Sequence, residues 1–180
     1  DNQIKFQGHG GEWARCNYAA NVGMGATHTL PKLPSNPPPI TGPTSEGWRH
    51  RWSRGVMGPN VASTLAQIID GTSKTGMLAE IRAGVHEGDP RGCWAFGHVG
   101  GNLIAYHGWG GDDNGPNWCG PNGDDIWGTA ALDCGSAEIR TTCMSCFQTT
   151  VFDQATARST HLGGVFVAMC DGSVQFISDD

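Results

Sequence analysis

The sequence predicts an α+β fold that is mostly antiparallel β, with one short helix and long glycine-rich loops. Glycine and proline are abundant, with 28 and 10 residues, so turns are frequent. Hydrophobic residues still make up 38% of the 180-residue chain, which argues against disorder and allows one domain over residues 1–180. Near the carboxyl end, an Asp-Gly pair separates two short apolar runs, a pattern typical of a β-hairpin.

The amino-terminal part is predicted to be largely irregular. One strand is expected near Asn17–Ala20, and residues 31–47 form a proline-rich loop, because proline fixes φ and removes a hydrogen-bond donor. The only helix follows, since Asn60 can cap it and Gly71 can end it in the left-handed conformation. Its apolar stripe, expected in the core, falls at helical spacing. The stripe consists of Val61, Leu65, Ile68 and Ile69.

Strands are expected at three places after the helix, where short runs are apolar or alternate between apolar and polar residues. These runs are Thr75–Arg82, Cys93–Phe96 and Leu103–Tyr106. Residues 107–150 are predicted to be a loop insertion that is rich in cysteine and acidic residues.

A terminal β-hairpin is predicted over residues 164–178. A two-residue type I′ turn requires positive φ at both positions, and Asp171-Gly172 suits it. This turn would place Met169 opposite Val174 and Val167 opposite Phe176, with one apolar face that must pack on another layer. The predicted apolar face comprises Val165, Val167, Met169, Val174 and Phe176.

Seven cysteines cannot all pair within one chain. Four lie in the loop insertion, where little apolar packing is available, and disulfides are the favoured interpretation for a secreted protein. A zinc site is the alternative, but the spacing supplies only one Cys-x-x-Cys pair. Cys93 and Cys170 lie in strand-like runs and are expected to be buried thiols. The disulfide candidates are Cys119, Cys134, Cys143 and Cys146.

The acidic residues of the loop insertion are candidate calcium ligands. Carboxylate and amide oxygens on a glycine-rich loop are the ligands that calcium prefers. The spacing is not that of a helix–loop–helix calcium site, so a solvated acidic loop is the competing interpretation. The candidates are Asp112, Asp113, Asn114, Asp124 and Asp125.

Tryptophan is enriched, with seven residues against two tyrosines. Trp109, Trp118 and Trp127 lie in the same acidic segment, and indoles beside carboxylates can stack on a sugar ring and hydrogen-bond it. These three residues could therefore bind a glycan. Indoles can equally fill space in the core of a domain with few large aliphatic residues. We expect Trp94 to have this packing role.

His161 and Asp171 suggest a catalytic pair, but the predicted strand geometry argues against one. The strand between them spans roughly 20 Å at about 3.3 Å per residue. We therefore expect Asp171 to stabilise the turn and His161 to hydrogen-bond backbone where the strand begins.

Charge and motif content narrow the function further. A net charge of −6 disfavours nucleic-acid binding, because no broad basic surface is available for phosphates. No run of 18 apolar residues and no cleavable leader is visible. The sequence also lacks a nucleophile elbow, a phosphate-binding glycine loop and paired zinc histidines, so a non-enzymatic protein is expected, with no required cofactor.

His161, nine intervening residues and then Asp171-Gly172 resemble the carboxy-terminal signature of a family of secreted, pilin-like proteins of unknown function that are abundant in planctomycete-type bacteria. The resemblance covers roughly residues 12–178 in the order typical of the family. Further matching stretches are Ile69–Thr75, Met77–Glu80, Asp89–Ala95 and Ala157–Ser159.

The resemblance implies a pilin-like (pseudopilin) head domain that normally follows a prepilin-type leader and a hydrophobic stem helix, which we expect this chain to lack. It implies a structural or assembly role at the bacterial cell surface or in a secretion apparatus such as type II secretion. The expected partners are other pilin-like subunits or the stem segment, with membrane contact only through that stem. The expected location is extracytoplasmic: cell surface, periplasmic or secreted. The alternative is an extracellular ligand-binding module, most plausibly for a glycan and dependent on calcium.

Overall fold

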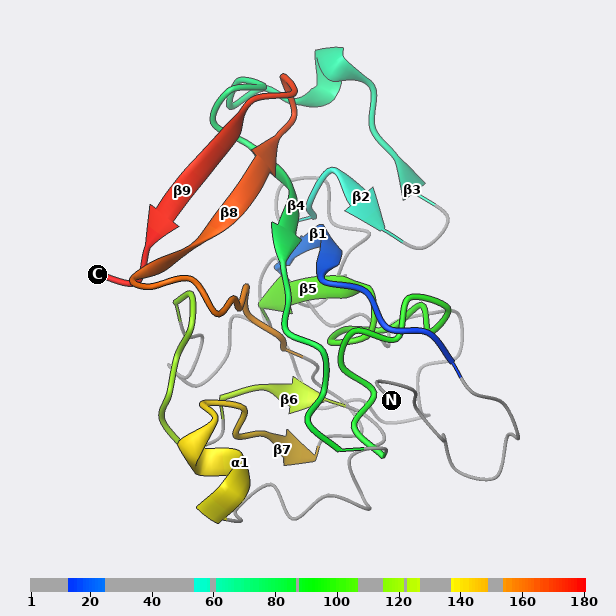
Figure 1. Ribbon diagram of the computed structural model, residues 1–180. Helices are drawn as coiled ribbons and strands as arrows, with labels where there is room; N and C mark the ends of the chain where they lie inside the picture. Colours follow the sequence, from blue (N-terminus) through cyan, green and yellow to red (C-terminus); the bar gives the residue numbers. More distant parts are fainter. Residues whose placement is uncertain are drawn as a thin grey trace, which may run out of the picture.

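The structure is a computed structural model whose central feature is a five-stranded sheet with the strand order β5-β1-β4-β8-β9 (Figure 1). It describes residues 13–24, 54–58, 61–86, 88–106, 115–121, 123–126, 137–148 and 154–180. The strands of the sheet are β1 (Tyr18–Met24), β4 (Gly76–Glu80), β5 (Leu103–Tyr106), β8 (Gly164–Met169) and β9 (Val174–Ser178).

The sheet is mixed, although most of its pairs are antiparallel. β4 pairs antiparallel with β1 and with β8, so that Ala79 lies opposite both Ala19 and Val167. β1 also pairs with β5, but in parallel, with Ala20 opposite Leu103. The predicted α+β, mostly β fold class is confirmed.

Two clusters of small and medium apolar residues form the core. One packs between the β1–β5 end of the sheet and Ile126, and the other lies along the centre of the sheet. The first contains Val22, Val99, Leu103, Ala105, Ile126, Cys146 and Ala155. The second contains Ala19, Ala79, Ile81, Ile104, Ala157 and Val165.

A smaller unit of secondary structure lies below the sheet in Figure 1, in the segment 107–150 that was predicted to be a loop. Here β6 (Asp125–Ile126) and β7 (Phe147–Gln148) pair in parallel, and α1 (Ala137–Thr141) precedes β7. Ile126 is fully buried and joins this unit to the core of the sheet. The short helix of the described part of the chain is therefore in this segment, not before Gly71.

The helix predicted up to Gly71 is wrong. Its first part is strand β3 (Val61–Ala62), which pairs with β2 (Met57–Gly58), and only the 3₁₀ turn η2 (Leu65–Gln67) is helical. A 3₁₀ turn has three residues per turn, so the apolar stripe does not line up on one face. Leu65 is 69% exposed and Ile69 is 70% exposed, so neither is in the core. Gly71 does adopt a positive φ of 92°, while Asn60 lies outside the described residues.

The other strand predictions had mixed outcomes. Leu103–Tyr106 is a strand with the predicted bounds, and strands β1 and β4 overlap the predicted ones. Cys93–Phe96 is not a strand, because hydrogen bonds from Cys93 N–H to the Pro90 carbonyl and from Phe96 N–H to the Cys93 carbonyl fold it into turns. The proline-rich loop over residues 31–47 lies outside the described residues.

The terminal hairpin is present, but its turn and register differ from the prediction. Ala168 pairs with Val174 and Phe166 with Phe176, so that Cys170, Asp171 and Gly172 form a three-residue loop. Gly172 has a positive φ of 86°, whereas Asp171 does not, and a type I′ turn is therefore excluded.

The cause of the shifted register is a local side-chain contact. Asp171 Oδ1 accepts hydrogen bonds from the backbone N–H and the hydroxyl of Ser173, at 2.9 and 2.7 Å, which stabilises the longer loop. The one-residue shift moves Phe176 and Val174 to the face opposite Val165, so the predicted apolar face is wrong. The prediction that Asp171 stabilises the turn is confirmed.

The helical segments in the described ranges are too short or too polar to span a bilayer.

Two glycines of the hairpin allow its geometry to be tested. Alanine at Gly172 would meet open space, so only the positive φ opposes it, and Gly172→Ala should cost about 1–2 kcal/mol of unfolding free energy. A Cβ on Gly164 would lie 2.2 Å from the Ile177 carbonyl oxygen and 2.7 Å from the Phe176 ring. Gly164→Ala should therefore be the more destabilising change, because the strand pair must separate to accept it. Urea unfolding of both variants measures this order, and equal losses would contradict the register.

Candidate functional site

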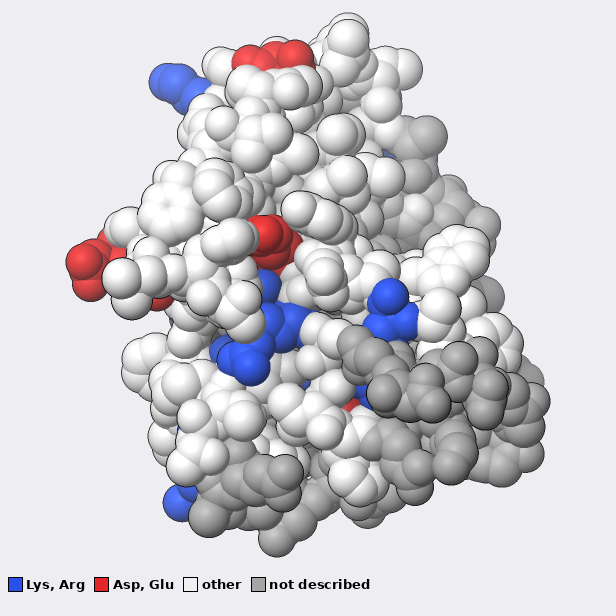
Figure 2. Space-filling view, in the orientation of Figure 1, with Lys and Arg blue, Asp and Glu red and all other residues white. Residues whose placement is uncertain are grey.

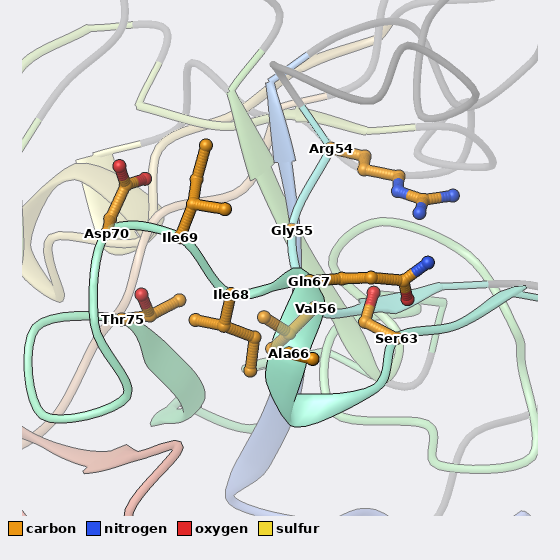
Figure 3. Close-up of a pocket in the computed structure, with 10 residues that line it drawn as sticks. All are labelled: Arg54, Gly55, Val56, Ser63, Ala66, Gln67, Ile68, Ile69, Asp70 and Thr75. Atoms are coloured by element: carbon orange, nitrogen blue, oxygen red, sulfur yellow. The ribbon is translucent and has the colours of Figure 1, made fainter.

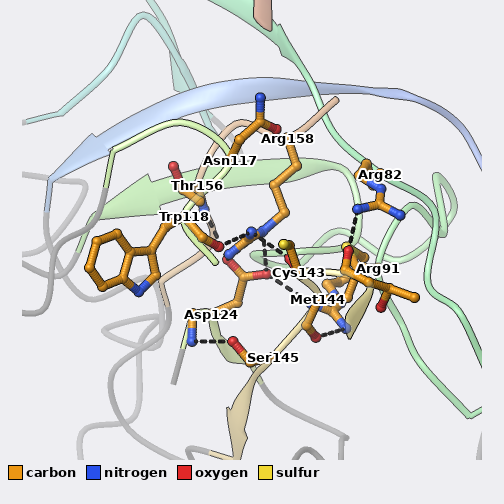
Figure 4. Close-up of polar contacts among 12 residues, drawn as sticks. Arg82, Arg91, Asn117, Trp118, Asp124, Cys143, Met144, Ser145, Thr156 and Arg158 are labelled. Carbon is orange, nitrogen blue, oxygen red and sulfur yellow. Dashed lines mark hydrogen bonds and ion pairs between the residues drawn. The ribbon is translucent and has the colours of Figure 1, made fainter. Parts of the chain in front are cut away.

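The interior of the protein contains a buried cluster of charged side chains centred on Asp124 (Figure 4). Its carboxylate lies between two guanidinium groups: Arg91 Nη1 and Arg158 Nε are both 3.0 Å from Oδ2, and Arg158 Nη2 is 3.0 Å from Oδ1. All three residues are at most 2% exposed. Asp124 precedes β6, whereas the arginines come from the loops after β4 and before β8.

Asp89 completes the cluster, which thus contains two positive and two negative groups. Arg91 Nη2 donates to Asp89 Oδ2 at 2.7 Å and to the Met144 carbonyl at 2.7 Å. Because each charge has an opposite partner, the cost of burying these groups is offset. We call Asp89, Arg91, Asp124 and Arg158 the ionic core.

The ionic core also fixes the disulfide-bonded loops. Arg158 Nη1 donates to the Trp118 carbonyl at 2.6 Å and to the Cys143 carbonyl at 2.9 Å. Cys119, which follows Trp118 in the chain, forms a disulfide with Cys143. One guanidinium therefore holds both sides of this cross-link against the sheet.

The pKa values in the ionic core are dominated by its charges. Burial alone would raise the pKa of Asp124, but the positive charges of Arg158 and Arg91 hold that pKa below its ordinary value. Burial alone would lower the pKa of Arg91, and the carboxylates of Asp89 and Asp124 raise it above its ordinary value. Both groups are consequently charged at neutral pH.

The candidate calcium ligands are not brought together in the described part of the chain. Asp124 lies between the two arginines, which pair with its carboxylate. Asp125 lies in β6 and is buried. Asp112, Asp113 and Asn114 lie outside the described residues, and among the described ones no group of three His, Cys, Asp or Glu side chains is placed to hold a metal ion. Calcium binding by this loop stays a prediction.

The cysteine prediction is confirmed for Cys119 and Cys143, which pair with each other. Cys146 is also disulfide-bonded, and Cys134 lies outside the described residues. Cys16, Cys93 and Cys170 are free thiols. Cys93 is buried as predicted, and burial raises the pKa of its thiol. Cys170 is half-buried and lies in the hairpin loop.

Only one of the three candidate sugar-binding tryptophans can be placed. Trp118 is 45% exposed, and its indole covers Gly120, where an added Cβ would lie 2.6 Å from the ring. Trp109 and Trp127 lie outside the described residues. Trp94, expected to fill space inside the protein, is 62% exposed.

His161 contacts a carboxylate and not the backbone, which corrects the prediction for its side chain. Its Nε2 is 3.1 Å from Oε1 of Glu80, and the other oxygen of Glu80 accepts the Phe166 N–H at 2.8 Å. The Glu80 carboxylate therefore links the histidine to the start of β8. His161 and Asp171 lie at opposite ends of β8 and form no pair.

The His161 ring begins a row of aromatic side chains on the outside of the hairpin. It packs edge-on against Phe166, with ring centroids 5.1 Å apart, and Phe166 packs edge-on against Phe176 at 5.2 Å. Val174 lies on the same face, because it pairs with Ala168 two positions from Phe166. Phe166, Phe176 and Val174 are 37%, 47% and 65% exposed. We call these three residues the hairpin surface.

Two of the cavities in the described part of the molecule are relevant to function. The larger, of about 590 Å³, lies beside η2, and Figure 3 shows Val56, Ala66 and Ile68 close together in it, with the polar groups of Arg54 and Gln67 to one side. The smaller, of about 340 Å³, is called the His161 pocket. It is lined by Arg82, Asn117, Cys143, Arg158, Ser159, Thr160, His161, Leu162, Gly163 and Asp179.

The sequence reasoning assigned no role to the residues that organise this region, although three of them lie in stretches that resemble the family. Glu80, Arg91 and Arg158 lie in such stretches, whereas Arg82 does not. Their partners are distant in sequence, since Arg91 reaches Asp124 across 33 positions and His161 reaches Glu80 across 81. One local signal was present: Asp89 and Arg91 are two residues apart, and the Asp89 carboxylate accepts both the backbone N–H and the guanidinium of Arg91.

Asp124 offers a direct test of the ionic core. Asp124→Asn would leave two buried arginines with one carboxylate, so a loss of about 3–5 kcal/mol of unfolding free energy is expected. The wild type should be stabilised by this carboxylate above its ordinary pKa of 3.8 and lose that stabilisation as the pH falls toward the lower folded-state pKa. Thermal unfolding from pH 7 to pH 2 measures both effects, with the exposed Asp70→Asn as control. A variant that melts with the wild type at pH 7 would contradict the assignment.

Comparison with known proteins identifies the family of the chain. Residues 17–180 match the family described as "Protein of unknown function (DUF1559)". The match spans most of the chain, so the chain belongs to this family, which is associated with bacterial surface and pilin-like proteins. No curated protein and no solved structure matches. The disulfide also fits an oxidising, extracytoplasmic environment.

Proposed function

We propose that this DUF1559 protein is a non-enzymatic, pilin-like subunit that acts in assembly or display at the bacterial cell surface or in a secretion apparatus. The observation that carries the proposal is the hairpin surface, an exposed set of apolar side chains on the last strands of the sheet. In finer detail, we propose a pseudopilin-like head of the kind found in planctomycete-type bacteria, with His161 and Asp171-Gly172 as its signature.

The hairpin surface supports a packing role because it combines apolar side chains with an edge strand. β9 is the last strand of the sheet, and every residue in it is exposed. Edge strands of folded proteins are usually protected by charge, a bulge or a covering element. Residues 174–178 contain no charged side chain, so a covering element is the protection this edge requires.

An apolar helix is the covering element that this surface suits best. Phe166, Phe176 and Val174 form a ridge of aromatic and branched side chains, which can pack between side chains three and four positions apart on a helix. In a pilin-like assembly such a helix is the stem, either of the same protein or of a neighbouring subunit. The binding partner is therefore a pilin-like stem, and the domain has no need of nucleic acid.

A non-enzymatic role also agrees with how the reactive side chains are used. The ionic core groups are buried and neutralise one another. Ser159 Oγ donates to the Gly164 carbonyl at 2.7 Å and accepts the His161 backbone N–H at 3.0 Å, so the hydroxyl is held by the chain. These contacts favour a structural use of Ser159 and His161 over nucleophilic catalysis.

Photocrosslinking of the full-length protein in its native cells tests the assembly role. Phe176→p-benzoylphenylalanine should cross-link to an apolar helical segment of a pilin-like subunit, because that residue lies at the centre of the hairpin surface. The same substitution at Arg140, which is exposed on α1, is the control. Mass spectrometry identifies the products and separates contacts within one protein from contacts between subunits. Products at position 176 that match those at position 140 would argue against the proposal.

A calcium-dependent glycan-binding module is the second candidate, and the half-exposed indole of Trp118 favours it. If the indole stacks on a sugar, Trp118→Ala should weaken oligosaccharide binding by about threefold to tenfold, since such stacking contributes roughly 0.5–1.5 kcal/mol. Trp94→Ala, which removes an exposed indole elsewhere, should change nothing. Calorimetric titration with and without a calcium chelator measures both. Equal weakening by the two variants, or no binding at all, would exclude this function.

A further inference from the structure

We propose that the His161 pocket binds one carboxylate group through the guanidinium of Arg82. This site shares no residue with the hairpin surface, although His161 packs against Phe166, and it does not depend on the assembly function. It rests on an arginine that lacks an acidic partner, on the charge around that arginine and on the size of the pocket.

Arg82 differs from the arginines of the ionic core because no acidic side chain of the described segments forms an ion pair with it. Its Nη1 donates to the Thr142 carbonyl, and the side chain is half-buried after β4. In the described part of the chain, the ion pairs involve Arg91, Arg158 and His161, and none includes Arg82. A half-buried guanidinium with unused donors is the group that most often binds carboxylates in proteins.

Two positive groups of the ionic core, Arg91 and Arg158, act on Arg82, although the chain as a whole carries a net charge of −6. Burial lowers the pKa of Arg82, and the positive charges of Arg158 and Arg91 lower it further. Figure 2 shows basic side chains gathered near the middle of the face on view. An anion bound beside Arg82 would relieve this repulsion.

The remaining charges select a monoanion over a dianion such as phosphate. Asp179 lines the same pocket, and the Glu80 carboxylate lies 3.1 Å from the His161 ring. These two negative groups would repel a second negative charge on the ligand. Thr160 and His161 also line the pocket and can supply further hydrogen-bond donors.

The size of the pocket suits a small acidic group. Its volume of about 340 Å³ lies at the lower end of the range for ligand sites, which is roughly 300–1,000 Å³. The carboxylate could belong to the end of a peptide or to an acidic sugar, and both present the same planar group to the guanidinium.

An NMR titration at pH 7 and constant ionic strength tests the site, with the Nε–Hε signal of Arg82 as the readout. N-acetylglycine represents a peptide carboxylate, glucuronate represents an acidic sugar, and N-acetylglycinamide is the neutral counterpart. Each carboxylate should shift the signal with a dissociation constant of about 1–10 mM, as expected for one charge-assisted contact, and the amide should not. The carboxylate with the lower dissociation constant shows whether the natural ligand is a peptide or an acidic sugar.

Charge-matched variants separate this site from general attraction. Arg82→Gln should weaken carboxylate binding about tenfold or more, monitored on backbone signals of residues 159–163, because it removes the charge and the paired donors. Lys74→Gln removes one positive charge from the exposed turn before β4, whereas Arg82 follows that strand. The five residues of β4 span roughly 16 Å at about 3.3 Å per residue, which exceeds the Debye length of about 8–10 Å, so the affinity should stay within about twofold.

Arg82→Lys keeps the charge without the planar donor pair, so it should bind more weakly than the wild type even if Arg82→Gln is poorly folded. The proposal would be overturned if neither carboxylate shifted the signal, if phosphate bound more tightly than both, or if Lys74→Gln weakened binding as much as Arg82→Gln.

Discussion

The pairing of one buried carboxylate with two arginines is the constraint on which the rest of the structure depends. Asp124 joins Arg91, in the loops that follow β4, to Arg158, which leads into β8. The apolar clusters contain several alanines, which bury little surface each. Directional charge contacts therefore fix the position of the β6–β7 unit against the sheet. Small apolar side chains alone would fix that position less well.

Local signals in the sequence predicted individual strands well but failed where tertiary contacts decide the outcome. Leu103–Tyr106 is a short apolar run buried inside the sheet, and its bounds could be predicted. The stripe before Gly71 has helical spacing, yet β2 pairs with its first residue, and Leu65 and Ile69 face solvent. In the hairpin, the Asp-Gly pair located the turn, whereas the contact between Asp171 and Ser173 set the register.

The chemistry of the site was harder to predict than the fold. The sequence drew attention to Asp124 and His161, but it assigned them to a metal site and to a backbone contact. Their true partners, Arg158 and Glu80, are 34 and 81 positions away, and no short motif encodes such distances. Arg82 carried no signal, because its importance comes from the absence of a neutralising neighbour among the described residues.

The position of β4 in the sheet has a consequence for how the polypeptide reaches its native state. β4 pairs with β1 on one side and with β8 on the other, and the β4–β8 pair places Ala79 opposite Val167, which is 88 positions later in the chain. Strand pairs between segments so far apart in the sequence form slowly, because the chain between them must first close into a loop. During synthesis, β4 therefore lacks one of its two partner strands until Gly164–Met169 has emerged, and until then that edge of β4 is open to pairing with other strands.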